Sequence, residues 1–282
     1  AGLSRYKFSN SLSLEREVND TNGLQKALFN VDLFNSITDY IVKSDFQKTL
    51  GTVSLFRFGS EHVIHQFVPG VERLLSSNNS GQTRVEEAGK INNQNAIENT
   101  LYTELEFHSS TGATINLGGR LWTFMGKDKT FVRLEPRLLI SQAVGLTDGL
   151  KFSLGSSNQG MHQISSVTGT LPQNGWVGSS DQFKPMRNWQ TTLGYYFPVA
   201  PGVEINTDLY YKWFDGLSEQ NGVQVENTRT DFWTLVLEQG KGTSYGAEIM
   251  LVKKYGRVSG LASYGYSNSS RVFENINFGK RF

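Results

Sequence analysis

Apolar and polar residues alternate with a period of two along most of the chain, which is the pattern of β-strands with two different faces. In residues 131–142, for example, Val132 and Leu134 fall on one face while Arg133 and Glu135 fall on the other. Residues 24–34 also fit a short helix, but a strand with a bulge over 25–46 fits the pattern better. The alternation predicts eleven strands, over residues 3–15, 25–46, 51–68, 97–107, 113–124, 131–142, 150–155, 188–197, 202–214, 245–253 and 258–267.

A long hairpin joins residues 245–253 to residues 258–267 through a turn that contains Gly256. One face of both arms carries aliphatic groups, with tyrosines at the end far from the turn, and the other face is mostly small or polar. A soluble sheet would bury such an apolar face in a core. An outer-membrane barrel turns it toward lipid and ends it in an aromatic girdle.

The connections between the predicted strands alternate between short and long. Because successive antiparallel strands end on opposite rims, this alternation places the short joints on one rim and the long loops on the other. Short periplasmic turns and long extracellular loops are typical of transmembrane barrels. The tight joints are 47–50, 108–111, 143–149, 198–201 and 254–257, and the long loops are 69–96, 156–187 and 215–243.

Aromatic residues of the apolar face gather near the two predicted rims. Tyr and Trp favour the lipid headgroup boundary, since each joins an apolar body to a polar tip. A soluble β-sandwich, the alternative, has no need to sort its core aromatics to the strand ends. Phe107, Tyr195 and Phe197 lie toward the short-turn rim, and the predicted girdle of the long-loop rim is Trp189, Tyr211, Trp213, Tyr245, Tyr264 and Tyr266.

Composition is compatible with a barrel and excludes several other classes. The 282 residues carry a net charge of +1, without the basic surplus that nucleic-acid binding requires. There are no cysteines, so disulfide frameworks and thiolate metal sites are excluded. The sequence contains no run of 18 apolar residues, so no transmembrane helix is predicted. The 29 glycines against 6 prolines suit long strands with glycine turns.

Several segments resemble a known family. Residues 240–248 read Gly-Lys-Gly-Thr-Ser-Tyr-Gly-Ala-Glu, residues 253–257 read Lys-Lys-Tyr-Gly-Arg, and residues 134–138 read Leu-Glu-Pro-Arg-Leu. In their order along the chain, these segments resemble the barrel of TonB-dependent outer-membrane receptors, in the Bacteroidetes type that carries a carboxypeptidase-regulatory-like domain before the plug. Residues 1–96 match this pattern more loosely.

The resemblance implies an all-β fold, an antiparallel transmembrane β-barrel of about 22 strands, of which this chain supplies about 11. It places the protein in the outer membrane of a Gram-negative bacterium. It also implies active transport of a scarce ligand, which is a siderophore, an oligosaccharide or a peptide. The expected partners are membrane lipid, the plug domain of the same parent chain, and TonB acting through that parent chain. Because the sequence contains no TonB box or plug, and eleven strands is an odd number, we expect an internal barrel fragment.

Two other functions stay open. A passive porin or adhesin-like barrel would share the lipid-facing pattern, and a plug and TonB box in the full-length gene would argue against it. A soluble β-sandwich carbohydrate-binding module or glycosidase would bury the apolar face instead. We expect no enzymatic activity, no cofactor and no metal, because the four histidines are scattered without a helical i, i+4 pair.

Candidate functional residues fall into three groups. The apolar outward set, expected to face lipid, is Ile115, Leu117, Leu134, Leu193, Ile205, Leu209, Ile249 and Leu251. On the polar face, the tight joint near 126–129 sets Arg120 opposite Glu135 and predicts an ion pair. The predicted polar network of the lumen is Arg120, Arg133, Glu135, Arg137 and Glu248.

Ligand capture is expected on the long loops, because binding residues are common on loops held by a rigid scaffold. The aromatic candidates for stacking a ligand are Trp176, Phe183, Phe232 and Trp233. The alternative is that these rings pack against their own loops.

Overall fold

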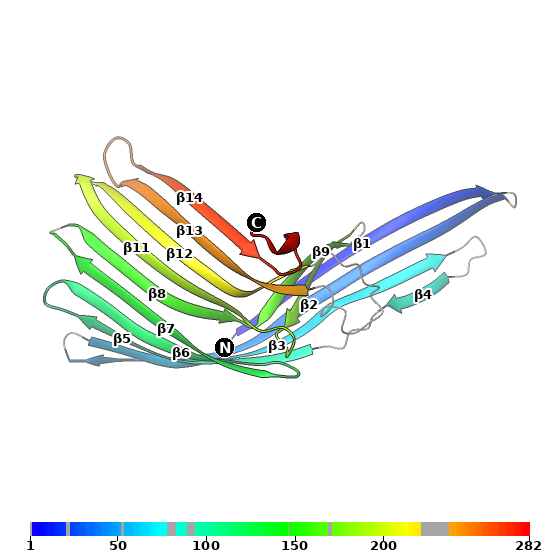
Figure 1. Cartoon of the computed structure of the whole chain (residues 1–282), viewed down its shortest axis with the longest axis horizontal. Coiled ribbons are helices and arrows are strands. Elements are labelled where there is room, and N and C mark those ends of the chain that lie inside the picture. Colours follow the sequence, from blue (N-terminus) through cyan, green and yellow to red (C-terminus); the bar gives the residue numbers. More distant parts are fainter. Residues whose placement is uncertain are drawn as a thin grey trace.

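The computed structural model describes residues 2–20, 23–51, 54–77, 83–88, 94–145, 147–168, 171–220 and 237–282. They form a single large antiparallel sheet of 12 strands and a separate two-stranded sheet (Figure 1). The large sheet runs in the order β1-β2-β3-β5-β6-β7-β8-β11-β12-β13-β14, with β4 paired to β3. The eleven strands of this path correspond to the eleven predicted segments, so the prediction of an all-β antiparallel sheet is confirmed.

The strands are longer than the alternation alone predicted. Their bounds are β1 Gly2–Asp20, β2 Gly23–Leu50, β3 Ser54–Ser77, β4 Thr83–Ala88, β5 Gln94–His108, β6 Ala113–Met125, β7 Thr130–Ala143, β8 Gly149–Gln159, β9 Met161–Thr168, β10 Leu171–Gly178, β11 Met186–Ala200, β12 Val203–Gln220, β13 Leu237–Lys253 and β14 Gly260–Val272. A short 3-10 turn, η1, spans Asn277–Gly279.

The bulge predicted in the second strand lies instead in the third, because one residue of β2, Asn35, faces two residues of β3, Pro69 and Gly70. The ladder between β2 and β3 shifts register between Phe34 and Ser36, opposite the segment that contains Pro69. Proline has no amide hydrogen for the ladder, so a bulge is where a strand tolerates it. The prediction that the third strand ends at Val68 is therefore wrong, since pairing resumes at Val71 and β3 continues to Ser77.

Two predicted loops contain additional strands. The segment 69–96 holds the end of β3 and all of β4, which pair with each other from Glu72 to Ser77. The segment 156–187 contains the hairpin β9–β10, paired from Met161 to Thr168. The sequence gives no clean alternation in either segment, because both are rich in Ser, Asn, Gly and Gln.

The hairpin β9–β10 crosses the concave side of the large sheet. Strand β10 contacts β1, β2 and β3, while β9 contacts β12, which lies far along the order of the sheet. The connections 109–112, 201–202 and 254–259, together with the end of β2 and the end of β7, gather at one end of the strands, on the left of Figure 1. We call this end the short-turn rim and the opposite end the long-loop rim.

The large sheet does not close on itself within the described residues. Strand β1 is paired only with β2 along the described part of the chain, and β14 is paired there only with β13. The result is an open, curved sheet with two edges (Figure 1). Among the described residues, no helix is long and apolar enough to cross a membrane.

Candidate functional site on the concave face

The register of the ladders sorts the side chains of the sheet into an outward and an inward face. Six members of the predicted outward set are exposed, from 41% for Leu251 to 62% for Leu134. Ile115 and Ile205 are half-buried, and no member of the set is buried against a second layer. The large sheet thus presents a continuous apolar convex surface, which is the surface a barrel turns toward lipid.

Four of the six predicted girdle residues form a continuous row of rings. Trp189 stacks on Trp213 at 6.2 Å between centroids, Trp213 lies 5.7 Å from Tyr211, and Tyr211 stacks on Tyr245 at 6.4 Å. The row crosses β11, β12 and β13 because cross-strand neighbours on one face lie side by side. Tyr264 and Tyr266 on β14 are exposed but make no ring contact with the row among the described side chains. We call the four contacting rings the aromatic row.

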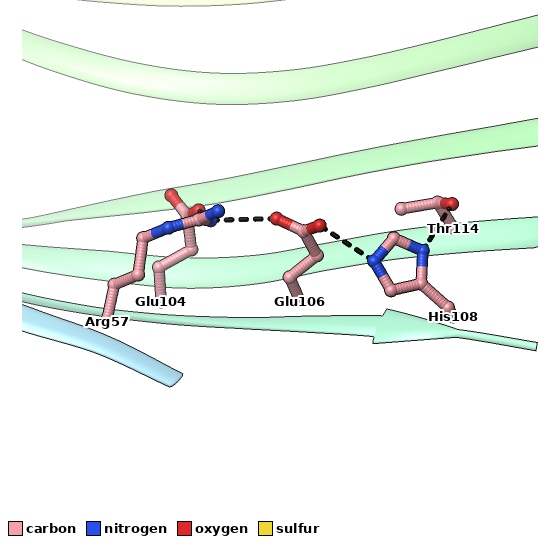
Figure 2. A network of polar contacts seen from close by, with 5 residues as sticks. All are labelled: Arg57, Glu104, Glu106, His108 and Thr114. Atoms are coloured by element: carbon pink, nitrogen blue, oxygen red, sulfur yellow. Dashed lines mark hydrogen bonds and ion pairs between the residues drawn. The ribbon is translucent and has the colours of Figure 1, made fainter. Parts of the chain in front are cut away.

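A chain of polar contacts lies on the inward face near the short-turn rim (Figure 2). The Nη1 atom of Arg57 donates to Glu104 Oε1 and to Glu106 Oε2, at 2.8 Å each. His108 continues the chain, with Nε2 at 2.9 Å from Glu106 Oε1 and Nδ1 at 3.0 Å from Thr114 Oγ1. The two carboxylates share one guanidinium, so they neutralise a cation and are not arranged as a free acid and base.

The register that sets Arg120 opposite Glu135 is present, but the predicted ion pair is wrong for the described side chains. Glu135 is 2% exposed, and its Oε1 accepts hydrogen bonds from the backbone amide and from Nδ2 of Asn158, at 2.6 and 2.9 Å. Arg120 lies over the ring of Tyr102 at 6.0 Å.

Glu135 is drawn away because the β7–β8 ladder ends close to it. That ladder pairs Arg137 with Gly155 and continues only toward the short-turn rim. Beyond it, the Glu135 carboxylate replaces a backbone carbonyl as the acceptor for the Asn158 amide. Arg133 closes the same seam, since its Nη1 donates to Asn158 Oδ1 at 2.9 Å. Glu135 and Arg133 thus form their hydrogen bonds with Asn158 of the neighbouring strand and not with Arg120.

The two remaining members of the predicted polar network lie apart from this seam. Arg137 lines a cavity of about 330 Å³ together with Glu104 and Gln190. Two buried acceptors of this cavity's lining, Asn116 Oδ1 and Asn188 Oδ1, have no hydrogen-bond partner in the described structure. Glu248 lies elsewhere, beside its cross-strand partner Asp208. The five predicted residues therefore share the inward face but do not form one connected network.

An apolar cluster on the inward face is the main feature that the sequence did not predict. Phe67, Ala96, Trp122, Phe124, Phe131 and Met161 are buried together, with Ile37 and Trp176 packed against them. Trp122 and Phe124 occupy positions of β6 that alternate with the outward Leu121, where the pattern elsewhere on the strand is polar. That local break in the polar face is the signal that could have indicated a packing partner inside the sheet. The partner is the hairpin β9–β10.

Of the predicted ligand-stacking rings, two lie in the described residues, and neither is freely exposed. Phe183 is 6% exposed and meets the ring of His162 edge-on at 6.1 Å. Trp176 is half-buried against the apolar cluster. Phe183 thus packs within its own segment, as the alternative interpretation expected, whereas Trp176 packs mainly against residues of the large sheet. Phe232 and Trp233 lie outside the described residues.

A second cavity, of about 440 Å³, opens beside these rings at the long-loop rim. It lies between the starts of β5 and β13, the β6–β7 turn and the segment that follows β10. Phe67, Val177 and Phe183 form its apolar wall, while Lys127 and Asp128 supply charge. Lys129 bonds to Asp181 at 2.6 Å on the same rim, and this ion pair lowers the pKa of the Asp181 carboxyl. The cavity is thus placed where a ligand would approach from the long-loop side.

The histidines are paired with protein groups. His65 Nδ1 lies 2.8 Å from Asp39 Oδ1, and His62 Nδ1 lies 2.8 Å from Asn99 Oδ1. Within the described ranges, no three His, Asp or Glu side chains are grouped as metal ligands.

His162 fixes the hairpin to the sheet at the long-loop rim. Its Nδ1 lies 2.7 Å from Ser218 Oγ on β12, and its Nε2 lies 3.1 Å from Ser179 Oγ. Burial of the ring lowers the pKa of His162 to about 4, from an ordinary value near 6.5. The neutral imidazole is therefore the form that fits this site.

Acidification should loosen the hairpin. Between pH 6.5 and 4 the unfolded segment binds a proton that the folded segment excludes, so stability falls as the pH falls. From pH 7 to pH 5 the expected loss is about 2 kcal/mol for a folded pKa of about 4. The protection factors of the amides in residues 161–168, which correct the measured hydrogen exchange for its intrinsic dependence on pH, should fall over this range. His162→Gln should remove this fall, and an equal fall in that variant would contradict the assignment.

Comparisons with known proteins agree with this geometry. The chain matches, over residues 3–282, the family model described as TonB dependent receptor-like, beta-barrel. No curated protein matches it significantly.

Solved structures are similar at low sequence identity. The FrpB iron transporter from Neisseria meningitidis (F5-1 variant, apoprotein form) is 14% identical with a TM-score of 0.58, over 95% of this chain and 45% of that chain. The RagAB peptide transporter is 10% identical with a TM-score of 0.54, over 99% of this chain and 38% of that chain. The FpvAI–pyocin S2 complex is 11% identical with a TM-score of 0.50, over 97% of this chain and 42% of that chain. At this identity the similarity shows the fold, and the chain spans less than half the length of each.

Proposed function

This chain belongs to the TonB-dependent receptor-like β-barrel family, and we propose that it forms part of the barrel of an active importer. Proteins of the family are located in the outer membrane of Gram-negative bacteria, and so is this one. The observation that carries the proposal is the pairing of an apolar convex face with a largely polar concave face over the described side chains of β2 to β14. The apolar face of such a sheet suits contact with lipid, and its polar face suits contact with a water-filled lumen.

The complete barrel, in this proposal, includes strands from the rest of a longer chain. The sheet has two edges, and an unpaired edge in lipid costs several kcal/mol for each unsatisfied backbone group. A barrel with twice this number of strands is wide enough to hold a plug domain. We propose that the plug of the same parent chain fills the concave side and that TonB acts on it through that chain.

The ligand is proposed to be a scarce siderophore, oligosaccharide or peptide. Support comes from the cavity at the long-loop rim, which combines apolar walls with Lys127 and Asp128. The long-loop rim corresponds to the extracellular side of outer-membrane barrels. The fold is shared with an iron transporter and a peptide transporter, each named for its own cargo.

The role we propose is transport and not catalysis, since members of the family are transporters. Among the inward carboxylates, Glu104 and Glu106 are held by Arg57, and Glu135 is held by Asn158. A passive porin is the second candidate. The hairpin across the concave side favours the importer, because it narrows the path that a passive pore would leave open.

Uptake by cells separates these functions. The complete receptor should be expressed in a strain that lacks other importers and offered three labelled probes: a ferric hydroxamate siderophore, a pentapeptide and a linear hexasaccharide. We expect at least one probe to accumulate against its gradient, and this accumulation should stop when TonB is deleted.

The matched controls are the receptor without residues 161–178 and the receptor without residues 221–236. Each deletion should reduce binding of the accumulated probe. Uptake that is unchanged without TonB would instead indicate a passive pore, and binding that survives both deletions would contradict capture by the long loops.

A further inference from the structure

A cavity on the convex face lies immediately beyond the aromatic row, on its long-loop side. Its volume is about 430 Å³, and its lining includes Trp213, Asp215, Lys241, Thr243, Ser270 and Arg281. Trp213, Lys241, Thr243 and Ser270 share the outward face by the register of β12, β13 and β14. The cavity therefore opens toward the surroundings of the barrel and not toward its lumen.

The height of the cavity is fixed by its position along β13. Lys241 lies four residues beyond Tyr245 of the aromatic row, which is about 13 Å along a strand. With a strand tilt of about 40°, the Cα atom of Lys241 lies about 10 Å above the aromatic row. Aromatic rows of outer-membrane barrels mark the boundary of the hydrocarbon. Lys241 is thus at the level of the headgroups of the outer leaflet.

The cavity has a surplus of positive charge. Arg271 is paired with Glu219 at 2.7 Å, so its charge is already neutralised. Lys241 and Arg281 are both exposed and stand against a single carboxylate, that of Asp215. Arg281 is brought there by the return of the chain after β14, where the Phe282 amide donates to the Arg271 carbonyl at 3.0 Å.

Asp215 sits between two cations and does not cancel the surplus. Its register partners are Arg187 on β11 and Lys241 on β13. The guanidinium of Arg187 lies over the ring of Trp189, 5.0 Å from its centroid, at the end of the aromatic row. One carboxylate therefore stands among three cations on this stretch of the rim.

The remaining lining suits an anionic headgroup that carries sugar or glycerol. Thr243 Oγ1 and Ser270 Oγ lie 3.1 Å apart, and whichever hydroxyl accepts the hydrogen bond between them keeps its own hydrogen for a ligand. Trp213, 38% exposed, lines the cavity beside them. Cations, hydroxyls and an aromatic wall together match a phosphate attached to a polar lipid headgroup.

We propose that this cavity binds the phosphate-bearing headgroup of an outer-leaflet lipid, with Lys241 as its central cation. The proposal depends on the location in the outer membrane and not on the transported ligand. A soluble anion would have no reason to prefer a site that is continuous with the lipid-facing surface. A lipid reaches it directly, because its acyl chains lie along the apolar strands below the aromatic row.

The test measures lipid binding to the complete receptor in dodecyl maltoside by native mass spectrometry. The probes are monophosphoryl lipid A, the same lipid without its phosphate, and inorganic phosphate. Lys241→Gln should weaken binding of monophosphoryl lipid A about fivefold, the effect of one cation near a membrane surface. Lys241→Arg should retain the affinity, since it keeps the charge.

The matched control is Lys253→Gln, on the same strand and the same face but at the short-turn rim. It should leave the affinity unchanged. Equal losses in the two glutamine variants would indicate nonspecific attraction and overturn the site. Equal binding of the dephosphorylated lipid would overturn the role of the phosphate, and inorganic phosphate binding as tightly as the lipid would assign a soluble anion instead.

Discussion

Replacing Phe124 with alanine should detach the hairpin β9–β10 from the sheet, at a cost of about 3–5 kcal/mol. The ring is fully buried and stacks with Trp122 at 6.0 Å, next to the imidazole of His65 at 6.3 Å. The hairpin approaches it closely, since a β-carbon on Gly160 would lie 2.2 Å from the Phe124 ring. Removing the ring leaves a cavity under the hairpin that this tight packing cannot collapse to fill.

The measurement is amide hydrogen exchange in residues 161–178 of the complete receptor in detergent. Protection of the hairpin should fall by two to three orders of magnitude, which is the exchange equivalent of about 3–4 kcal/mol, while β6 and β7 stay protected. The matched control is Leu121→Ala on the same strand, since Leu121 is 44% exposed on the convex face. Equal losses in the two variants would mean that the hairpin is not held by the inward cluster.

Arginine at Leu117 should destabilise the barrel in lipid by about 2–4 kcal/mol. Leu117 is 60% exposed on the convex face, midway along β6, and pairs with Leu105 and Leu138 on its two neighbouring strands. A guanidinium at this depth must enter hydrocarbon or distort the bilayer to reach water. Chemical unfolding of the receptor in phospholipid vesicles measures the difference from the wild type.

Depth provides the control for this variant. Met125→Arg places the same charge on the same face at the long-loop end of β6, where Met125 is 37% exposed. Its expected cost is about 0–1 kcal/mol, because the headgroup region solvates the cation. Equal costs at the two positions, or a negligible cost at Leu117, would show that this face of β6 does not contact the hydrocarbon.

The sequence by itself determined eleven of the twelve strands of the large sheet and the register of one hairpin, β6–β7. The joint at 126–129 sets Arg120 opposite Glu135, and the ladder has this pairing. The same period of two separates Leu117 and Leu134, which are exposed on the convex face, from Glu135, which is buried on the concave side. These features follow from local geometry, because alternation within a strand and the length of a turn fix which residues face each other.

The aromatic row was predictable for the same reason. Trp213 and Tyr211 are two residues apart on β12, and Trp189 and Tyr245 are brought beside them by ladders of adjacent strands. Here a local pattern, repeated on neighbouring strands, becomes a continuous surface without any contact between distant elements.

Only the tertiary structure decided what fills the concave side. Nothing in residues 161–178 shows that they return across the sheet, and the contact of β9 with β12 and of β10 with β2 is nonlocal. The same holds for Glu135, whose predicted partner was Arg120. The end of the β7–β8 ladder left the Asn158 amide without a backbone acceptor, and a buried amide must be satisfied. Alternation specifies the face on which a side chain lies, whereas the partner it meets there depends on which distant segment is packed against that face.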